Sequence, residues 1–190
     1  QSGSGKTYSL GVLLEHLLME TSLRVLVLDP NSDYVRLSEP RADADPAAAA
    51  RYREQAGKIL VRRGGTQGDD DRLALRVREL TPQHRAALMR LDPIADRDEY
   101  AQMEAAAEAG TPESLYGLID SEDAQALVRR ALNLGIHEYG LWSQNDDVSI
   151  VDDLVEGDAR CLVADLGSLD TQEERSLVAG TLLERLWRRR

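Results

Sequence analysis

The apolar positions near the two ends of the chain predict helices that alternate with strands. Five leucines within residues 6–20 recur at helical spacing, namely Leu10, Leu13, Leu14, Leu17 and Leu18. The segments RVLVLD (24–29) and RCLVAD (160–165) are continuous apolar runs that end in aspartate, which is typical of buried parallel strands. Strands and helices that alternate in this way form βαβ units, so the pattern predicts an α/β fold with a mostly parallel sheet flanked by helices.

The last predicted helix, residues 171–190, carries an apolar stripe that we expect to lie on the sheet. The stripe consists of Leu177, Val178, Leu182, Leu183, Leu186 and Trp187. Trp142 and Trp187 are interpreted as core anchors, because large aromatic side chains bury much apolar surface. Arg175 and Arg185 favour surface ion pairs, and the alternative is an arginine finger that reaches across a subunit boundary.

Between these ends, the pattern of apolar and polar residues is different. Residues 46–56 are Ala-rich and predict a helix. The segments 58–63 and 73–80 read as two short strands on either side of a polar, Gly-rich turn at 64–71. This arrangement predicts that the two strands pair as a hairpin.

Helical periodicity then dominates residues 81–135, which we interpret as a helical insertion between two halves of the sheet. Three helices are expected, over 81–90, 96–109 and 121–134. Thr81 and Ser121 stand at N-cap positions, and Gly135 supplies a stop signal.

Composition and charge limit the classes of function that the sequence allows. The sequence has 34 acidic and 23 basic residues and a formal charge of −11, which argues against a broad nucleic-acid surface. The basic groups at Arg62, Arg63 and 188–190 are interpreted as solvated surface. No apolar run approaches the roughly 18 residues of a membrane span. The single Cys161 suits a reducing compartment, so we expect a cytoplasmic protein without a membrane partner.

The first seven residues, QSGSGKT, carry the strongest chemical signal. Backbone N–H groups of residues 3–7, together with the start of the following helix, would surround a phosphate; glycine is needed because a Cβ would block the close approach. Lys6 would reach the β- and γ-phosphates as a positive charge, and Thr7 would offer its hydroxyl to Mg²⁺. We therefore predict a P-loop that binds a nucleoside triphosphate through Gln1, Ser2, Gly3, Ser4, Gly5, Lys6, Thr7 and Tyr8.

Three aspartates are candidates for the acidic partner that P-loop enzymes use near the metal ion. Asp29 and Asp165 each end a predicted strand, and for both the alternative role is to cap the following turn. Asp33 lies in the loop after Asp29, at the carboxyl edge of the sheet, where open α/β folds bind their ligands.

Two segments resemble the HerA-like ATPases, which belong to the HerA/FtsK branch of RecA-type motors. These are SGSGKTYSLGVLLEHLL and RVLVLDPNSDYVRL, and the DPNSDY loop is similar to the Asp-Pro-Asn/Gly-Glu-Tyr type loop of that family. Asp33 stands where the family often has Glu, so its side chain is one methylene shorter. The ending CLVADLGSLDTQEERSLVAGTLLERLWRRR is similar to the part that precedes the Walker B strand in this family, which would place the Walker B aspartate beyond Arg190.

The resemblance implies a RecA-like P-loop NTPase domain that binds ATP and Mg²⁺, with Lys6 and Asp33 as catalytic residues and Thr7 at the metal. Because the glycine that opens a P-loop would precede Gln1, we expect residues 1–190 to be one domain from a longer protein, without its first strand and its Walker B strand. The resemblance also implies a homo-oligomeric, hexameric ring that moves double-stranded DNA, in related systems beside a nuclease.

Three other functions fit the same residues. A conjugation or secretion ATPase belongs to the same branch of motors. A regulatory module would bind the nucleotide without sustained turnover. A P-loop kinase for a small substrate would need a basic patch and a lid, for which only Arg62, Arg63 and the 64–71 turn are candidates.

Overall fold

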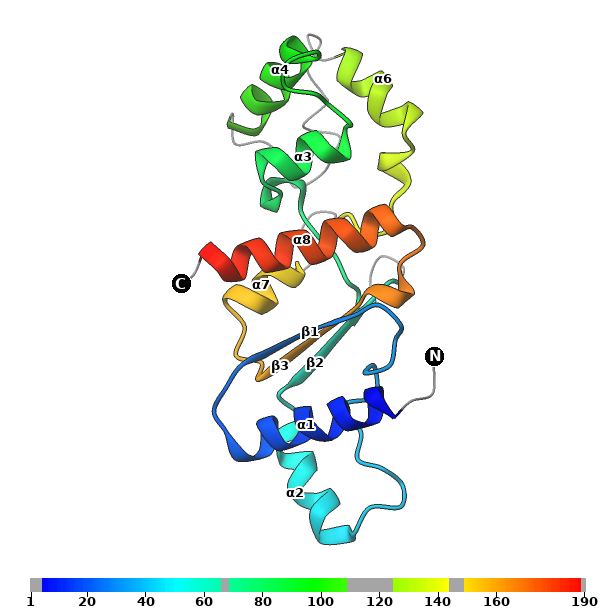
Figure 1. Ribbon diagram of the computed structural model, residues 1–190, viewed down its shortest axis with the longest axis vertical. Coiled ribbons are helices and arrows are strands. Elements are labelled where there is room, and N and C mark those ends of the chain that lie inside the picture. Colours follow the sequence, from blue (N-terminus) through cyan, green and yellow to red (C-terminus); the bar gives the residue numbers. More distant parts are fainter. Residues whose placement is uncertain (1–4, 66–68, 109–124, 144–148, 189–190) are drawn as a thin grey trace.

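The computed structural model describes residues 5–65, 69–108, 125–143 and 149–188, and within them the chain forms a parallel sheet between two layers of helices (Figure 1). The sheet has three strands in the order β1-β3-β2. They are β1 (Val25–Asp29), β2 (Ile59–Arg63) and β3 (Cys161–Asp165), and β3 pairs in parallel with both neighbours. The predicted α/β fold and the strands at both ends of the chain are therefore confirmed.

The central strand explains why its sequence is apolar throughout. All five residues of β3 are buried, because helices cover both faces of the sheet. Cys161 and Val163 face the core under α1 (Lys6–Glu20) and α2 (Pro46–Ala56), whereas Leu162 and Ala164 face the core under α8 (Gln172–Arg188). The helix α7 (Ile150–Val155) lies beside α8 on that second face (Figure 1).

A group of helices extends beyond α8, at the top of Figure 1. It comprises α3 (Pro82–Leu88), α4 (Arg97–Glu108), α6 (Gln125–Asn133) and the short η3 (Ile136–Glu138). Thr81 Oγ1 accepts a hydrogen bond from the His84 amide at 3.2 Å, so this predicted N-cap is confirmed, and Gly135 ends the group's last long helix with a φ of +66°. Ser121, the other predicted cap, lies outside the described residues.

Gly180 of α8 faces the ring of His84 where α8 contacts α3. A Cβ built on Gly180 of α8 would lie 2.8 Å from Nε2 of His84, which is closer than real Cβ contacts. A side chain at position 180 would therefore displace the His84 ring, which lies at the end of a side chain that can turn away.

The predicted hairpin is wrong. Residues 58–63 do supply a strand, β2, but it pairs in parallel with β3, and residues 73–80 form no strand. Leu75 instead makes an isolated parallel bridge with Trp142, and Val77–Glu79 form a short 3₁₀ helix, η1. The 73–80 segment is apolar because Leu73, Leu75 and Val77 are fully buried, so burial was mistaken for strand pairing.

The predicted stripe on α8 is only partly buried. Leu177, Val178 and Leu182 pack in the core, but Leu183 and Trp187 are 54% and 70% exposed. The interpretation of Trp187 as a core anchor is therefore wrong. Trp142 is a core anchor as predicted, because it is 6% exposed and donates from Nε1 to the Ile136 carbonyl at 2.7 Å.

Three arginines differ from their predicted environments. Arg62 is buried rather than solvated, and it pairs with Asp153. Arg175 donates to the Leu169 carbonyl, and Arg185 donates to the Glu79 carbonyl at 2.8 Å, so within the described part of the chain both reach backbone acceptors and not surface carboxylates. Arg175 thus fastens the start of α8 to the turn before it, and Arg185 fastens the end of α8 to η1.

None of the helices within the described ranges has the length and the apolar character needed to cross a bilayer.

Candidate functional site: the amino end of helix α1

The site begins with the turn that starts α1. Gly5 has a φ of +72°, a left-handed conformation that glycine adopts without strain. Its carbonyl accepts hydrogen bonds from the Ser9 amide at 2.9 Å and from the Ser9 hydroxyl at 3.0 Å, which closes the first turn of the helix. Lys6 and Thr7 are therefore the first helical residues, and both are solvent-exposed. Residues Gln1 to Ser4 of the predicted phosphate loop lie outside the described residues.

The structure brings two predicted site residues together. Thr7 Oγ1 donates a hydrogen bond to Asp33 Oδ2 at 3.4 Å, although 26 residues separate them. The hydroxyl of Tyr34 donates to the Thr7 carbonyl at 3.3 Å and so holds the loop after β1 against α1. The amino end of α1 and the carboxyl end of β1 lie on the same side of the molecule (Figure 1).

Asp29 shapes the loop that carries Asp33. Its Oδ1 accepts hydrogen bonds from the amides of Asn31 (3.3 Å) and Asp33 (3.0 Å), and its Oδ2 accepts one from Tyr34 (2.7 Å). The carboxylate is 1% exposed, so these three amides occupy it. Of the two roles open for Asp29, the structure favours the turn-forming one.

Asp165 has a similar role on the neighbouring strand. Its Oδ1 accepts a hydrogen bond from Ser32 Oγ at 2.6 Å and one from the Ser168 amide at 3.2 Å, in the turn that continues as η4 (Leu166–Ser168). Asp29 and Asp165 stand side by side in the register of the sheet. The two strand-terminal aspartates therefore fix the two loops that meet at the carboxyl edge.

Ser32 and Gly167 are site-shaping residues that the sequence interpretation missed. Ser32 has a φ of +59°, which is uncommon for a residue with a side chain. A Cβ on Gly167 would lie 2.5 Å from Ser32 Oγ and 2.9 Å from the Ser32 amide nitrogen. The β1 loop can approach the η4 turn only because residue 167 has no side chain. The Asp-Leu-Gly-Ser sequence held this signal, but its partner loop is far away in the chain.

A groove of about 540 Å³ runs from Thr7 along α1, between that helix and the loop of residues 33–43. Tyr8, Gly11 and Glu15 form part of its helical wall. In the opposite wall, burial and then the neighbouring carboxylates of Asp33 and Asp29 raise the pKa of Tyr34, so its hydroxyl stays protonated as a donor at neutral pH.

The donor set at this end of the groove fits Mg²⁺ bound with a nucleotide. Mg²⁺ takes oxygen ligands and is usually held by one or two protein groups together with phosphates and water. The Thr7 hydroxyl and the Asp33 carboxylate are two exposed oxygen groups within 3.4 Å of each other, beside the helix terminus that favours an anion. The described residues contain no group of three or more His, Cys, Asp or Glu side chains arranged to hold a metal by themselves.

Comparison with known proteins identifies the family to which this chain belongs. No curated protein and no solved structure matches the chain. One family does match, described as helicase HerA, central domain, and the match spans residues 1–186. It covers α1, the sheet and nearly all of α8, so it includes both loops of the site. The chain therefore belongs to the helicase HerA central-domain family, a family of ATPase helicases and translocases.

Proposed function

We propose that this chain is the ATP-binding part of a motor that couples ATP hydrolysis to the movement of duplex DNA in a hexameric ring. Membership of the HerA central-domain family supports the ATPase class. The single observation that carries the assignment of the site is the approach of Asp33 to Thr7 at the amino end of α1.

Each residue of the proposed site has a separate task. The exposed ammonium of Lys6 would offset negative charge on the β- and γ-phosphates, and the amides of residues 1–8 would bind those phosphates at the start of the helix. Bound Mg²⁺ would neutralise part of the charge on the triphosphate. Thr7 would contribute its hydroxyl to the ion, and Asp33 would accept a hydrogen bond from water at the same place.

The shorter side chain of Asp33 is compatible with this task. The Asp29 carboxylate draws the backbone of residues 31–34 inward, and Tyr34 ties that loop to the Thr7 carbonyl. The loop thereby carries the Asp33 carboxylate to hydrogen-bond distance of the Thr7 hydroxyl. The backbone position thus supplies the reach that glutamate would supply through an extra methylene.

The test is ATP hydrolysis by the full-length protein, with and without duplex DNA. Lys6→Ala, Thr7→Val and Asp33→Asn should each lower turnover by about 100-fold, the usual effect of removing one preorganised charge-stabilising group. Thr7→Ser keeps the hydroxyl and should retain most of the activity. Arg97→Ala is the matched control, since Arg97 lies on α4, away from the groove, with a side chain that is 81% exposed.

The outcomes separate the alternatives. Turnover that DNA stimulates, and that the Lys6 variant lacks, supports the DNA motor. ATP binding without measurable turnover in the unaltered protein contradicts a motor and supports a regulatory module. Unchanged turnover in Lys6→Ala contradicts the assignment of the site itself.

A further inference from the structure

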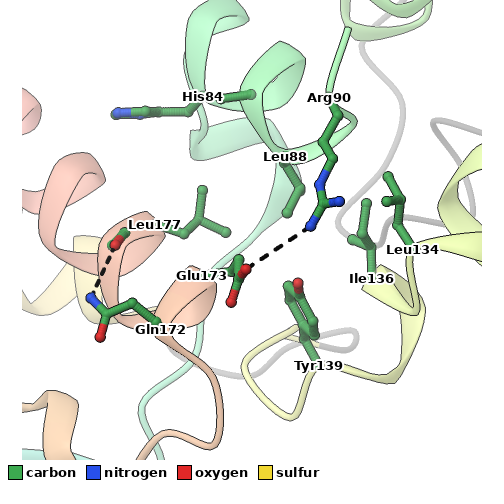
Figure 2. A pocket seen from close by; sticks show the side chains of 11 residues that line it. His84, Leu88, Arg90, Leu134, Ile136, Tyr139, Gln172, Glu173 and Leu177 are labelled. Carbon is green, nitrogen blue, oxygen red and sulfur yellow. Dashed lines mark hydrogen bonds and ion pairs between the residues drawn. The ribbon is translucent and has the colours of Figure 1, made fainter.

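A second cavity, of about 350 Å³, lies between α3, η3 and the first turns of α8 (Figure 2). It is on the face of the sheet opposite α1, so it is separate from the groove that begins at Thr7. Its volume falls in the range of cavities that bind small molecules. The cavity therefore calls for an explanation that the nucleotide site does not provide.

The lining of this cavity combines an apolar floor with charged groups at its edge. Leu88 of α3, Ile136 of η3 and Leu177 of α8 supply aliphatic surface from three different elements. Tyr139 adds an aromatic ring, which stacks on Trp142 with ring centroids 6.3 Å apart and an interplanar angle of 15°. Such a floor favours the apolar body of a ligand, and the stacked ring provides a rigid wall.

Arg90 is the cation at this edge, and its backbone is unusual. It follows α3 with a φ of +51°, a left-handed conformation that is disfavoured for side chains other than glycine by about 1–2 kcal/mol. The Arg90 amide donates to the Ala87 carbonyl at 3.1 Å, and the Arg90 carbonyl accepts from Arg130 Nη1 at 3.0 Å. The turn is thus held on both sides, and it directs the guanidinium across the cavity toward Glu173 (Figure 2).

The guanidinium of Arg90 remains available to a ligand. Arg90 Nη2 lies 4.0 Å from Glu173 Oε1, at the limit of an ion pair, and the side chains are 69% and 60% exposed. An exposed pair of this kind contributes little to stability. An anion that reached Arg90 could therefore use the guanidinium without breaking a strong contact.

The charges of Arg90 and Glu173 determine which class of anion this cavity favours. An arginine fork matches a carboxylate or a phosphate in two-point geometry. Glu173 lies next to the same fork and would repel a doubly charged phosphate more strongly than a singly charged carboxylate. Glu173 would also accept a hydrogen bond from an ammonium group beside that carboxylate.

We propose that this cavity binds a carboxylate attached to a large apolar group, with the carboxylate on Arg90 and the apolar group against Leu88, Ile136 and Leu177. A free apolar amino acid and the C-terminal residue of a peptide share this chemistry. Since the cavity walls come from α3, η3 and α8, the ligand would hold the helical group against the sheet layer.

Equilibrium dialysis of the full-length protein against three probes tests the proposal. L-phenylalanine has both charges, N-acetyl-L-phenylalanine has only the carboxylate, and L-phenylalaninamide has only the ammonium. The first two should bind at millimolar concentration and the third should not. Stronger binding of L-phenylalanine, lost in Glu173→Gln, identifies a free amino acid; equal binding of the two carboxylates identifies a chain end.

Arg90→Gly is the decisive variant, because glycine suits the left-handed backbone and should preserve the fold. It should weaken binding of the carboxylate probes by about ten- to a hundredfold, as expected for the loss of charged hydrogen bonds. Arg97→Ala, at a site on α4 whose side chain is 81% exposed, should leave binding unchanged. Thermal unfolding of each variant checks that the fold is intact. Failure of both carboxylates to bind, equal binding of the amide, or undiminished binding in Arg90→Gly would overturn the proposal.

Discussion

Arg62 and Asp153 form a two-point ion pair inside the protein. Arg62 Nε donates to Asp153 Oδ2 at 2.6 Å, and Arg62 Nη2 donates to Asp153 Oδ1 at 3.0 Å. The two side chains are only 11% and 10% exposed. Because Arg62 belongs to β2 and Asp153 to α7, the pair fastens an outer strand of the sheet to the helical layer that covers it.

Removing one member of this pair should be more damaging than removing both. Asp153→Leu leaves the Arg62 charge buried without its carboxylate, so we expect a loss of about 3–5 kcal/mol in the free energy of unfolding. The double variant Arg62→Met/Asp153→Leu leaves no unpaired charge and should recover part of that loss. Urea unfolding of Asp153→Leu, Arg62→Met and the double variant measures the difference. A double variant that loses the sum of two single effects would show that the charges are not coupled.

This pair also shows where sequence interpretation stops. Arg62 and Arg63 look alike in the sequence, and the pattern predicts that both are solvated. Only Arg62 faces Asp153, whose position 91 residues later depends on how the whole sheet is assembled. The strands at 24–29 and 160–165 could be predicted because continuous apolar runs record burial on both faces. The partner of each strand is not recorded in such a run, and for this reason the sequence pattern indicates a hairpin for residues 58–63, which in the structure pair with β3.

Asp29 and Asp33 should separate stability from activity. Asp29→Asn replaces one acceptor oxygen with an NH₂ group facing backbone amides, so we expect a loss of about 1–3 kcal/mol in the free energy of unfolding. Asp33 is exposed, and Asp33→Asn should change stability by no more than about 0.5 kcal/mol while it lowers ATP turnover. Urea unfolding and an ATPase assay on the same preparations make the comparison. Full stability in Asp29→Asn would contradict the turn-forming role of Asp29.

Gly167 should tolerate no side chain. In Gly167→Ala the new Cβ would meet Ser32, so the two loops at the carboxyl edge must separate. We expect a loss of about 1–3 kcal/mol in stability, the usual penalty for overpacking, together with lower ATP turnover because Asp33 follows Ser32 directly. Gly140→Ala is the matched control, since a Cβ there would meet no atom within 4 Å. Equal behaviour of the two variants would show that the approach of the loops is not needed.

The candidate site was predictable to the extent that it is local in sequence. Lys6, Thr7 and Asp33 stand in short motifs, and the structure places Thr7 beside Asp33. The contact between Ser32 and Asp165 spans 133 residues and depends on the parallel register of β1 and β3. A single sequence carries no direct record of such a contact. Only the folded structure shows that Asp165 holds the loop after β1 in place through Ser32.

Cys161 should make stability fall at alkaline pH. Burial raises the pKa of its thiol from 9.0 to about 11. The unfolded chain would therefore lose this proton near pH 9, while the folded protein keeps it until about pH 11. The stabilising contribution of the neutral thiol is thus complete below pH 9 and is lost as the pH rises from 9 to 11.

Urea unfolding at several pH values between 8 and 11 tests this expected fall in stability. Burial also raises the pKa of Tyr52, from 10.0 to about 12, so some decline above pH 10 will remain without the thiol. Cys161→Ala isolates the contribution of the cysteine. Between pH 9 and 10 its free energy of unfolding should decline less than that of the unaltered protein, whatever its overall stability.

A thiol reagent should modify Cys161 slowly in the folded protein and rapidly in urea, since the thiolate is the reactive form. Rapid modification of the folded protein at pH 8 would contradict a buried, protonated thiol.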